Sequence, residues 1–271
     1  EGSVVVSPAN CPGVVGVAGI RHVGTKVGFS NLGPGVALGA PGGNCVNVGQ
    51  GEPCLFSIDT TTNLGTQSPG ASGYTDQFRF NVGTSFSAPI VSGIAGLMAS
   101  VNGRLSPAQI LARLQEGATR PFPVSTDPTI PTCRVPISSS DIQASECVCT
   151  TQTCGAGMAN ALGSIRAALR PVAAIAVPAT VSPGQNVVLR ASGSGAACNR
   201  SVVRYSWTAP GGGTTPPGIV GADTDTVIVV APATGSFTLR LRVTDDAGRE
   251  DAADVVVSAA SATTVAPAVA S

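Results

Sequence analysis

The stretch Gly-Thr-Ser-Phe-Ser-Ala-Pro-Ile-Val-Ser-Gly, residues 83–93, decides how this chain is interpreted. It places Ser85 directly after a glycine and directly before a segment that favours a helix over residues 87–101, with Ser87 as its cap. A glycine lets the backbone approach a bound molecule closely, and a helix start leaves N–H groups without intrahelical partners. Such N–H groups can stabilise an oxyanion, at about 3 kcal/mol per donor. From these residues alone, Ser85 fits either a nucleophile or a plain helix cap.

Three further parts of the chain carry patterns of the same kind. Residues 8–19 read PANCPGVVGVAG, residues 29–34 read FSNLGP and are followed by LGAPG at 38–42, and residues 154–161 read CGAGMANA. Together with residues 83–93, and in the same order, these segments resemble the motifs of the subtilisin family of serine endopeptidases. The resemblance covers residues 1–170. It predicts an α/β fold, a partial subtilisin-like parallel sheet with flanking helices. The residue pattern itself predicts two helices after that of residues 87–101: one opens at Ser106-Pro107 and stops near Gly117, and the other covers residues 156–169.

The resemblance also assigns chemical roles. Ser85 matches the family's nucleophile, and its backbone N–H would supply about half of the oxyanion hole. In the family the aspartate, the histidine and the oxyanion asparagine all precede the serine, the asparagine just before the segment that matches Glu1-Gly2. We therefore expect all three residues upstream of this chain. The chain would then be a C-terminal fragment of the catalytic domain and inactive by itself. Its expected partner is the missing N-terminal half of that domain. Asn10 and His22 lie at the wrong positions for these roles.

Other interpretations of the function remain open at this point. The chain could be an inactive or regulatory fragment that serves as a binding module, and upstream Asp-Thr/Ser-Gly and His-Gly-Thr segments would decide for the enzyme. Alternatively, the C-terminal module could carry the chain's role, as adhesion or polysaccharide binding, but the sequence shows no aromatic strip. Asp59 and Asp76 are expected to be loop acids outside the catalytic triad. The expected substrates are proteins or peptides.

After Pro171 the pattern changes to that of an antiparallel β-sandwich. Apolar residues alternate with polar ones over residues 237–243, and shorter strands are expected at 186–191, 203–208 and 226–230. The segments Tyr205-Ser206-Trp207 and Val243-Thr244-Asp245 resemble PKD-like immunoglobulin-type modules. Tyr205 and Trp207 are two apart, so they share one face, which we expect to be the core. The predicted domains are residues 1–170, 171–260 and a linker, 261–271.

The amino-acid composition indicates in which cellular compartment the protein is expected and which classes of partner are not expected. The 15 basic and 15 acidic residues balance, so no nucleic acid or acidic membrane surface is expected as a partner. The longest apolar stretches, residues 90–101 and 172–181, are too short to span a membrane. Eight cysteines among 34 glycines and 21 prolines favour disulfides over a metal site, and hence a secreted, extracellular protein. No cofactor is identifiable, and a structural calcium ion is implied only by the family resemblance.

The cysteine spacing gives a partial pairing. Cys45 and Cys54 lie in a long insertion, residues 42–81, and are expected to bond to each other. Two more disulfides are expected among Cys133, Cys147, Cys149 and Cys154, with the connectivity open. Cys11 would then need a partner in the missing half, and Cys198 would be left over.

Overall fold

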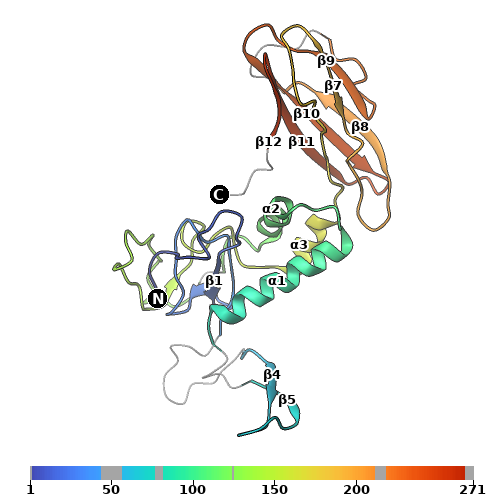
Figure 1. Cartoon of the computed structure of the whole chain (residues 1–271). Helices are drawn as coiled ribbons and strands as arrows, with labels where there is room; N and C mark the ends of the chain where they lie inside the picture. Colours follow the sequence, from blue (N-terminus) through green and yellow to red (C-terminus); the bar gives the residue numbers. More distant parts are fainter. Residues whose placement is uncertain (1, 44–56, 77–81, 124, 211–217, 266–271) are drawn as a thin grey trace. The chain divides into compact units, whose positions relative to one another are not determined.

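The computed structural model describes residues 2–43, 57–76, 82–123, 125–210 and 218–265 (Figure 1). Contacts divide the chain into two compact units, one of residues 1–96 and 113–164, the other of residues 97–112 and 165–268. The division between the units passes through all three helices, α1 (Thr84–Val101), α2 (Pro107–Gly117) and α3 (Ala161–Ala168). The expected domain boundary at Pro171 remains a prediction.

The first unit is built on a four-stranded sheet in the order β3-β1-β2-β6. Its strands are β1 (Val17–Ile20), β2 (Thr25–Lys26), β3 (Leu38–Pro41) and β6 (Cys147–Val148). β1 and β3 are parallel, with Val17 opposite Leu38, whereas β2 is antiparallel to both β1 and β6. β1 and β3 are short, almost continuous apolar runs because parallel strands are buried on both faces. The expected α/β class with flanking helices is confirmed, and the sheet is mixed.

Two of the three helices, α1 and α3, differ from their predicted bounds at their starts. α1 begins at Thr84, three residues before the predicted start, so Ser87 lies inside the first turn and is not the cap. α2 begins as predicted: Ser106 and Gln109 exchange side-chain-to-backbone hydrogen bonds, which form a capping box. α3 is shorter than the predicted 156–169, because Met158 pairs with Gly39 and Thr119 in extended bridges before the helix starts.

The insertion at residues 42–81 contributes one hairpin to the described part of the chain. Strands β4 (Thr60–Asn63) and β5 (Ser72–Thr75) are antiparallel. The Asn63 side chain closes the loop, since its Oδ1 accepts the N–H groups of Gly65 and Gly70 and its Nδ2 donates to the Gly70 carbonyl. The predicted Cys45–Cys54 bond lies outside the described residues.

The C-terminal strands form the predicted antiparallel sandwich. One sheet has the order β12-β11-β10-β8 and the other pairs β7 with β9. The strands are β7 (Asn186–Arg190), β8 (Val202–Thr208), β9 (Thr226–Val230), β10 (Ser236–Asp245), β11 (Glu250–Ser258) and β12 (Ala262–Val265). Residues 261–271 were expected to be linker, but the β-branched run at Thr263 adds β12 to the sheet edge beside β11.

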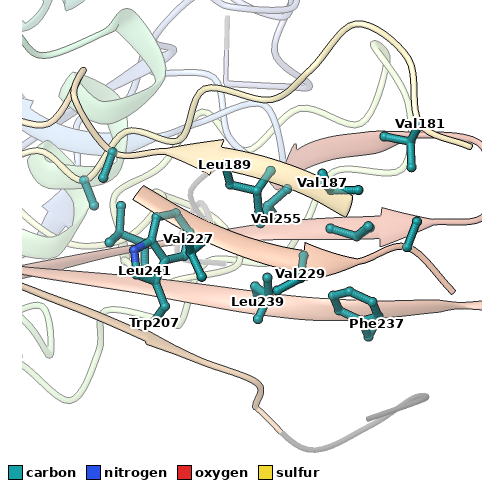
Figure 2. Packing of buried hydrophobic residues seen from close by; sticks show 14 of the residues in the cluster. Val181, Val187, Leu189, Trp207, Val227, Val229, Phe237, Leu239, Leu241 and Val255 are labelled. Carbon is teal, nitrogen blue, oxygen red and sulfur yellow. The ribbon is translucent and has the colours of Figure 1, made fainter. Parts of the chain in front are cut away.

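The core of the sandwich consists mainly of the apolar residues that alternate with polar ones along the strands (Figure 2). Leu239 and Leu241 of β10 are fully buried, and they pack with Val227 and Val229 of β9. Trp207 is buried in the same cluster, where its indole N–H donates to the Thr224 carbonyl at 3.0 Å, and Tyr205 packs against the cluster. The two aromatic residues therefore serve the core, as predicted.

Candidate active site

Ser85 is the second residue of α1, and its position depends on the glycine two residues earlier. Gly83 has a φ of +142°, a backbone conformation that side chains strongly disfavour. Its carbonyl accepts the Phe86 N–H at 3.0 Å, which closes the first turn around Ser85. Ser85 itself is exposed. The chain thus presents a serine at the surface at the point where a helix begins.

The parallel strands hold this turn in place. Gly42 follows β3, and its N–H donates to the Ile20 carbonyl at the end of β1, while its own carbonyl accepts the Gly83 N–H at 2.9 Å. The Ser87 hydroxyl, fully buried, donates to the Pro41 carbonyl at 3.0 Å. The start of α1 is therefore fixed at the carboxyl ends of β1 and β3, the edge where open α/β sheets carry their ligand sites.

Close packing makes Gly42 a second necessary glycine. A Cβ on Gly42 would lie 2.9 Å from the Cα of Gly19 and 3.0 Å from the Ser87 hydroxyl oxygen. Neither distance leaves room for a methyl group unless the backbone shifts or the Ser87–Pro41 hydrogen bond breaks. Ser87 therefore packs against Gly42 and bonds to Pro41, and it does not cap the helix as predicted. The sequence analysis did not identify this packing role of Gly42. The Ala-Pro-Gly pattern at 40–42 was the available signal.

This arrangement supports one kind of chemistry. The N–H groups of a helix's first turn lack intrahelical acceptors, and the positive end of the helix dipole lies at the same place. An exposed hydroxyl beside them can attack a carbonyl whose oxygen becomes negative next to these donors. The exposed Ser85 lies in the first turn of such a helix.

The other polar residues considered from the sequence lie on other elements. His22 is exposed in the turn between β1 and β2. Asp59 precedes β4 and Asp76 follows β5, and both are exposed. Asn10 lies in the turn between the N-terminus and β1. None of these four residues belongs to α1, the helix that carries Ser85.

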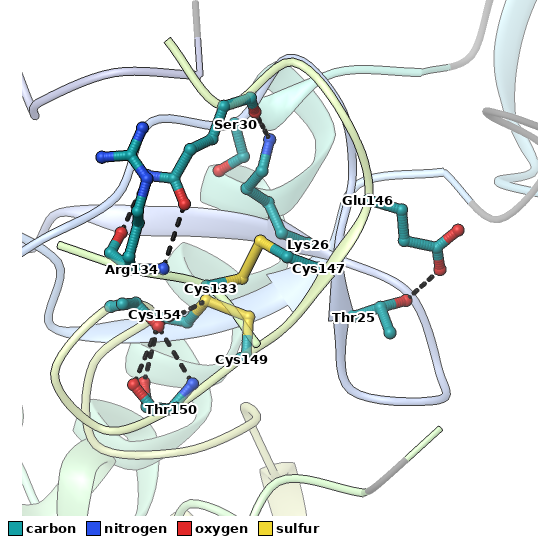
Figure 3. The surroundings of a disulfide bond; sticks show 12 residues. Thr25, Lys26, Ser30, Cys133, Arg134, Glu146, Cys147, Cys149, Thr150 and Cys154 are labelled. Atoms are coloured by element: carbon teal, nitrogen blue, oxygen red, sulfur yellow. Dashed lines mark hydrogen bonds between the residues drawn. A yellow bond between two sulfur atoms is a disulfide. The ribbon is translucent and has the colours of Figure 1, made fainter. Parts of the chain in front are cut away.

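The four clustered cysteines form two disulfides, Cys133–Cys147 and Cys149–Cys154 (Figure 3). All four are buried and belong to the core of the first unit, beside Ile20 and Leu32. The expected pair of bonds is confirmed, and their connectivity is now fixed. Cys11 and Cys198 are free and exposed.

Among the described residues, one cluster of side chains has the spacing of metal ligands, that of Cys133, Cys149 and Cys154, but its sulfur atoms are committed to disulfides. Calcium prefers six to eight oxygen ligands, with carboxylates prominent. This sulfur cluster therefore says nothing about the calcium ion implied by the family resemblance, which remains a prediction.

A large part of α1 is exposed although the helix is apolar. Ile90 is 36% exposed and Leu97 51%. A Cβ added at Gly93 or Gly96 would meet nothing within 4 Å. The helix is long and apolar enough to cross a membrane by length and composition, with a mean hydropathy of 1.4, a test that core helices of soluble proteins also pass.

Comparisons with known proteins bear on both parts of the chain. A family model described as "Subtilase family" matches residues 1–157, and one described as "K319L-like, PKD domain" matches residues 178–258. The second match, together with the sandwich, shows that the C-terminal part is a PKD domain.

Curated relatives match over less than half of the chain. An "Extracellular protease" of Xanthomonas campestris pv. campestris is 36% identical over 112 residues, 41% of this chain and 16% of the relative. A "Probable subtilase-type serine protease" of Deinococcus radiodurans is 34% identical over 41% of this chain and 15% of the relative. "Mycosin-1" of Mycobacterium tuberculosis is 36% identical over 43% of this chain and 23% of the relative. The matches thus span less than a quarter of the length of these relatives.

Solved structures give weaker matches. A structure titled for proteases from Pseudoalteromonas arctica is 25% identical, covers 60% of this chain and 38% of that chain, and has a TM-score of 0.39. The solution structure of a PKD domain is 16% identical, covers 30% of this chain and 81% of that chain, and has a TM-score of 0.24.

Proposed function

The chain belongs to the subtilase family, and on that premise we propose that it is part of a serine-type endopeptidase in which Ser85 is the nucleophile. One observation carries the proposal. Ser85 is exposed at the first turn of α1, and Gly83 and Gly42 fix that turn at the carboxyl ends of β1 and β3. All of these residues lie within the matched range of residues 1–157.

The proposed reaction proceeds through an acyl-enzyme. The Ser85 hydroxyl oxygen attacks the scissile carbonyl carbon while a histidine accepts the hydroxyl proton, and an aspartate orients that histidine. The carbonyl oxygen becomes negative and accepts the Ser85 backbone N–H, together with an asparagine side chain. The amine leaves with the proton from the histidine, and water then hydrolyses the ester at Ser85.

The histidine, aspartate and asparagine are proposed to come from an N-terminal half of the catalytic domain, the principal partner of this chain. The exposed face of α1 supports this partner, because Ile90 and Leu97 lie on it and Gly93 and Gly96 leave it flat enough for close packing. The hydroxyls of this helix suit burial as well. Ser92 donates to the Ala88 carbonyl and Ser100 to the Leu97 carbonyl, so neither would be left unsatisfied in an apolar interface.

The relatives and the disulfides also suggest the substrates and the compartment of the proposed protease. The substrates are proposed to be extracellular proteins or peptides, since two of the relatives are named as proteases and one of these as extracellular. Disulfides in the core of the first unit favour a secreted protein. The PKD domain fits the same environment. No cofactor is required, because the nucleophile and the oxyanion donors are protein groups.

The test is proteolysis by the complete protein and by two variants. We expect Ser85→Ala to abolish nearly all peptide-bond hydrolysis, since loss of the nucleophilic serine in subtilisin costs about a millionfold in turnover. Ser92→Ala is the matched control, an exposed serine on the same helix, and should retain activity. If Ser85→Ala keeps a tenth or more of the wild-type turnover, Ser85 is only a helix residue.

The partner is tested separately from the nucleophile. We expect the 271-residue chain alone to be inactive and to recover activity when the N-terminal half is added. Gly96→Leu should leave the stability of this chain unchanged, because its side chain enters open space, yet should prevent this recovery. Recovery by Gly96→Leu equal to wild type would show that the N-terminal half does not cover this face. An upstream sequence without aspartate and histidine motifs would favour the alternative, an inactive binding fragment.

A further inference from the structure

Lys26, the chain's single lysine, is completely buried in the first unit. It lies on β2, the strand between β1 and β6, opposite Ile20 of β1 and Cys147 of β6. Figure 3 shows Lys26 near Cys147. Taking an ammonium group out of water is expensive unless its hydrogen bonds and charge are compensated. A buried lysine that has no place in the proposed catalytic chemistry therefore requires an explanation.

The compensation comes from backbone carbonyl groups. The Lys26 ammonium donates to the carbonyl oxygens of Val27 at 3.2 Å, Gly28 at 2.8 Å and Gln143 at 2.6 Å. An ammonium has three hydrogens, and these three acceptors use all of them. Glu146, on the same disulfide-closed loop as Gln143, instead accepts hydrogen bonds from Arg21 and Thr25. The partners of Lys26 are thus dipoles, arranged as oxygen ligands are around a bound cation.

The three carbonyl groups belong to two segments far apart in the sequence. Val27 and Gly28 follow β2, whereas Gln143 lies in the loop that Cys133–Cys147 closes. Gln143 is central to that loop, since its side chain exchanges hydrogen bonds with both backbone groups of Arg134. Its N–H also donates to the Gly2 carbonyl at 2.8 Å. A cation between these carbonyls therefore joins the loop and the N-terminal segment to the sheet.

We propose that the carbonyl oxygens of Val27, Gly28 and Gln143 form a cation-binding site that the chain fills with its own Lys26 ammonium group. When the side chain is truncated, the same site takes a free primary ammonium ion. Burial lowers the pKa of Lys26 to about 8, so that the amine is still mostly protonated at neutral pH. The proposal does not depend on the protease function, because it concerns how this unit is held together.

The first test removes the side chain and supplies the cation from solution. Lys26→Ala should lower the melting temperature of the chain by about 10 °C, because it removes three hydrogen bonds to a charged group. n-Propylammonium chloride replaces the missing atoms and should restore at least a third of the loss, with saturation. Tetramethylammonium, which has no N–H, and n-propanol, which has no charge, should not restore stability at the same concentration.

A cavity without carbonyl ligands provides the matched control. Leu32→Ala removes a fully buried side chain from the same unit. It should lose stability by a comparable amount and should gain nothing from n-propylammonium. Equal rescue of both variants, or no rescue of Lys26→Ala, would overturn the proposal. So would a Lys26→Met variant as stable as wild type, because methionine fills the space but leaves the three carbonyls without a donor.

A second measurement needs no variant, and decides the matter if Lys26→Ala does not fold. Labelling with ¹⁵N-lysine gives one side-chain signal, since the chain has one lysine. We expect an ammonium signal that is protected from hydrogen exchange, shows couplings across hydrogen bonds to carbonyl carbons, and titrates near 8. A rapidly exchanging signal without couplings to carbonyl carbons would show that no such site exists.

Discussion

Gly42→Ala is the perturbation that most directly links the packing of the strands to the position of Ser85. The added methyl group would lie 2.9 Å from the Gly19 Cα and 3.0 Å from the Ser87 hydroxyl oxygen. Relieving the overlap by a backbone shift costs about 1–3 kcal/mol, and losing the Ser87–Pro41 hydrogen bond costs about 1 kcal/mol more. We therefore expect the free energy of unfolding of the first unit to fall by about 2–4 kcal/mol, measured by urea denaturation.

The same substitution should affect catalysis more than binding. Gly42 holds Gly83 through a backbone hydrogen bond, so a shift of Gly42 moves the turn that carries Ser85. A displacement of about 1 Å can cost a hundredfold in turnover, and we expect a loss of that order in the complete protease. Gly103→Ala is the matched control, because its nearest new contact is the Ala99 carbonyl oxygen at 3.8 Å. Stability and turnover of Gly42→Ala that match those of Gly103→Ala would refute the argument.

Two further predictions concern charged groups outside the site. Asp245 is buried at the β10–β11 turn, where burial would raise its pKa but the N–H groups of Arg249 and Ala247 lower it. Asp245→Ala should destabilise the PKD domain by about 2 kcal/mol in thermal unfolding. The control Asp254→Ala, which removes a partly exposed ion pair with Arg240, should cost under about 1 kcal/mol. The hydrogen bond from Arg134, and then the Ile137 N–H, lower the pKa of Asp141 from 3.8 to about 2. This contribution to stability is present above about pH 4 and is lost as the pH falls through about 2, so Asp141→Asn should flatten the stability profile between these values, and an unchanged profile would contradict the assignment.

The sequence predicted those elements whose pattern is local. The alternation over residues 237–243 located β10, and Ser106-Pro107 marked the start of α2, because strand period and helix capping depend on near neighbours. The motif at 83–93 identified Ser85 through a resemblance, which the residues alone left undecided.

What the sequence could not show depends on contacts between distant residues. α1 starts at Thr84 because Gly42, about forty positions earlier, holds Gly83, and no local signal reports that bond. The connectivity of four closely spaced cysteines has three solutions, and only the fold selects Cys133–Cys147 and Cys149–Cys154. Lys26 carried no signal beyond its rarity, because its acceptors are backbone carbonyls, which every sequence contains.

Covalent labelling of Ser85 tests the central claim most directly. A fluorophosphonate probe reacts with an activated serine hydroxyl, and peptide mass spectrometry identifies the residue that carries it. In the complete protein we predict labelling at Ser85, none in Ser85→Ala, and none in the 271-residue chain alone. Labelling at another serine, or no labelling of a complete protein that contains the upstream aspartate and histidine, would contradict the assignment of Ser85 as the nucleophile.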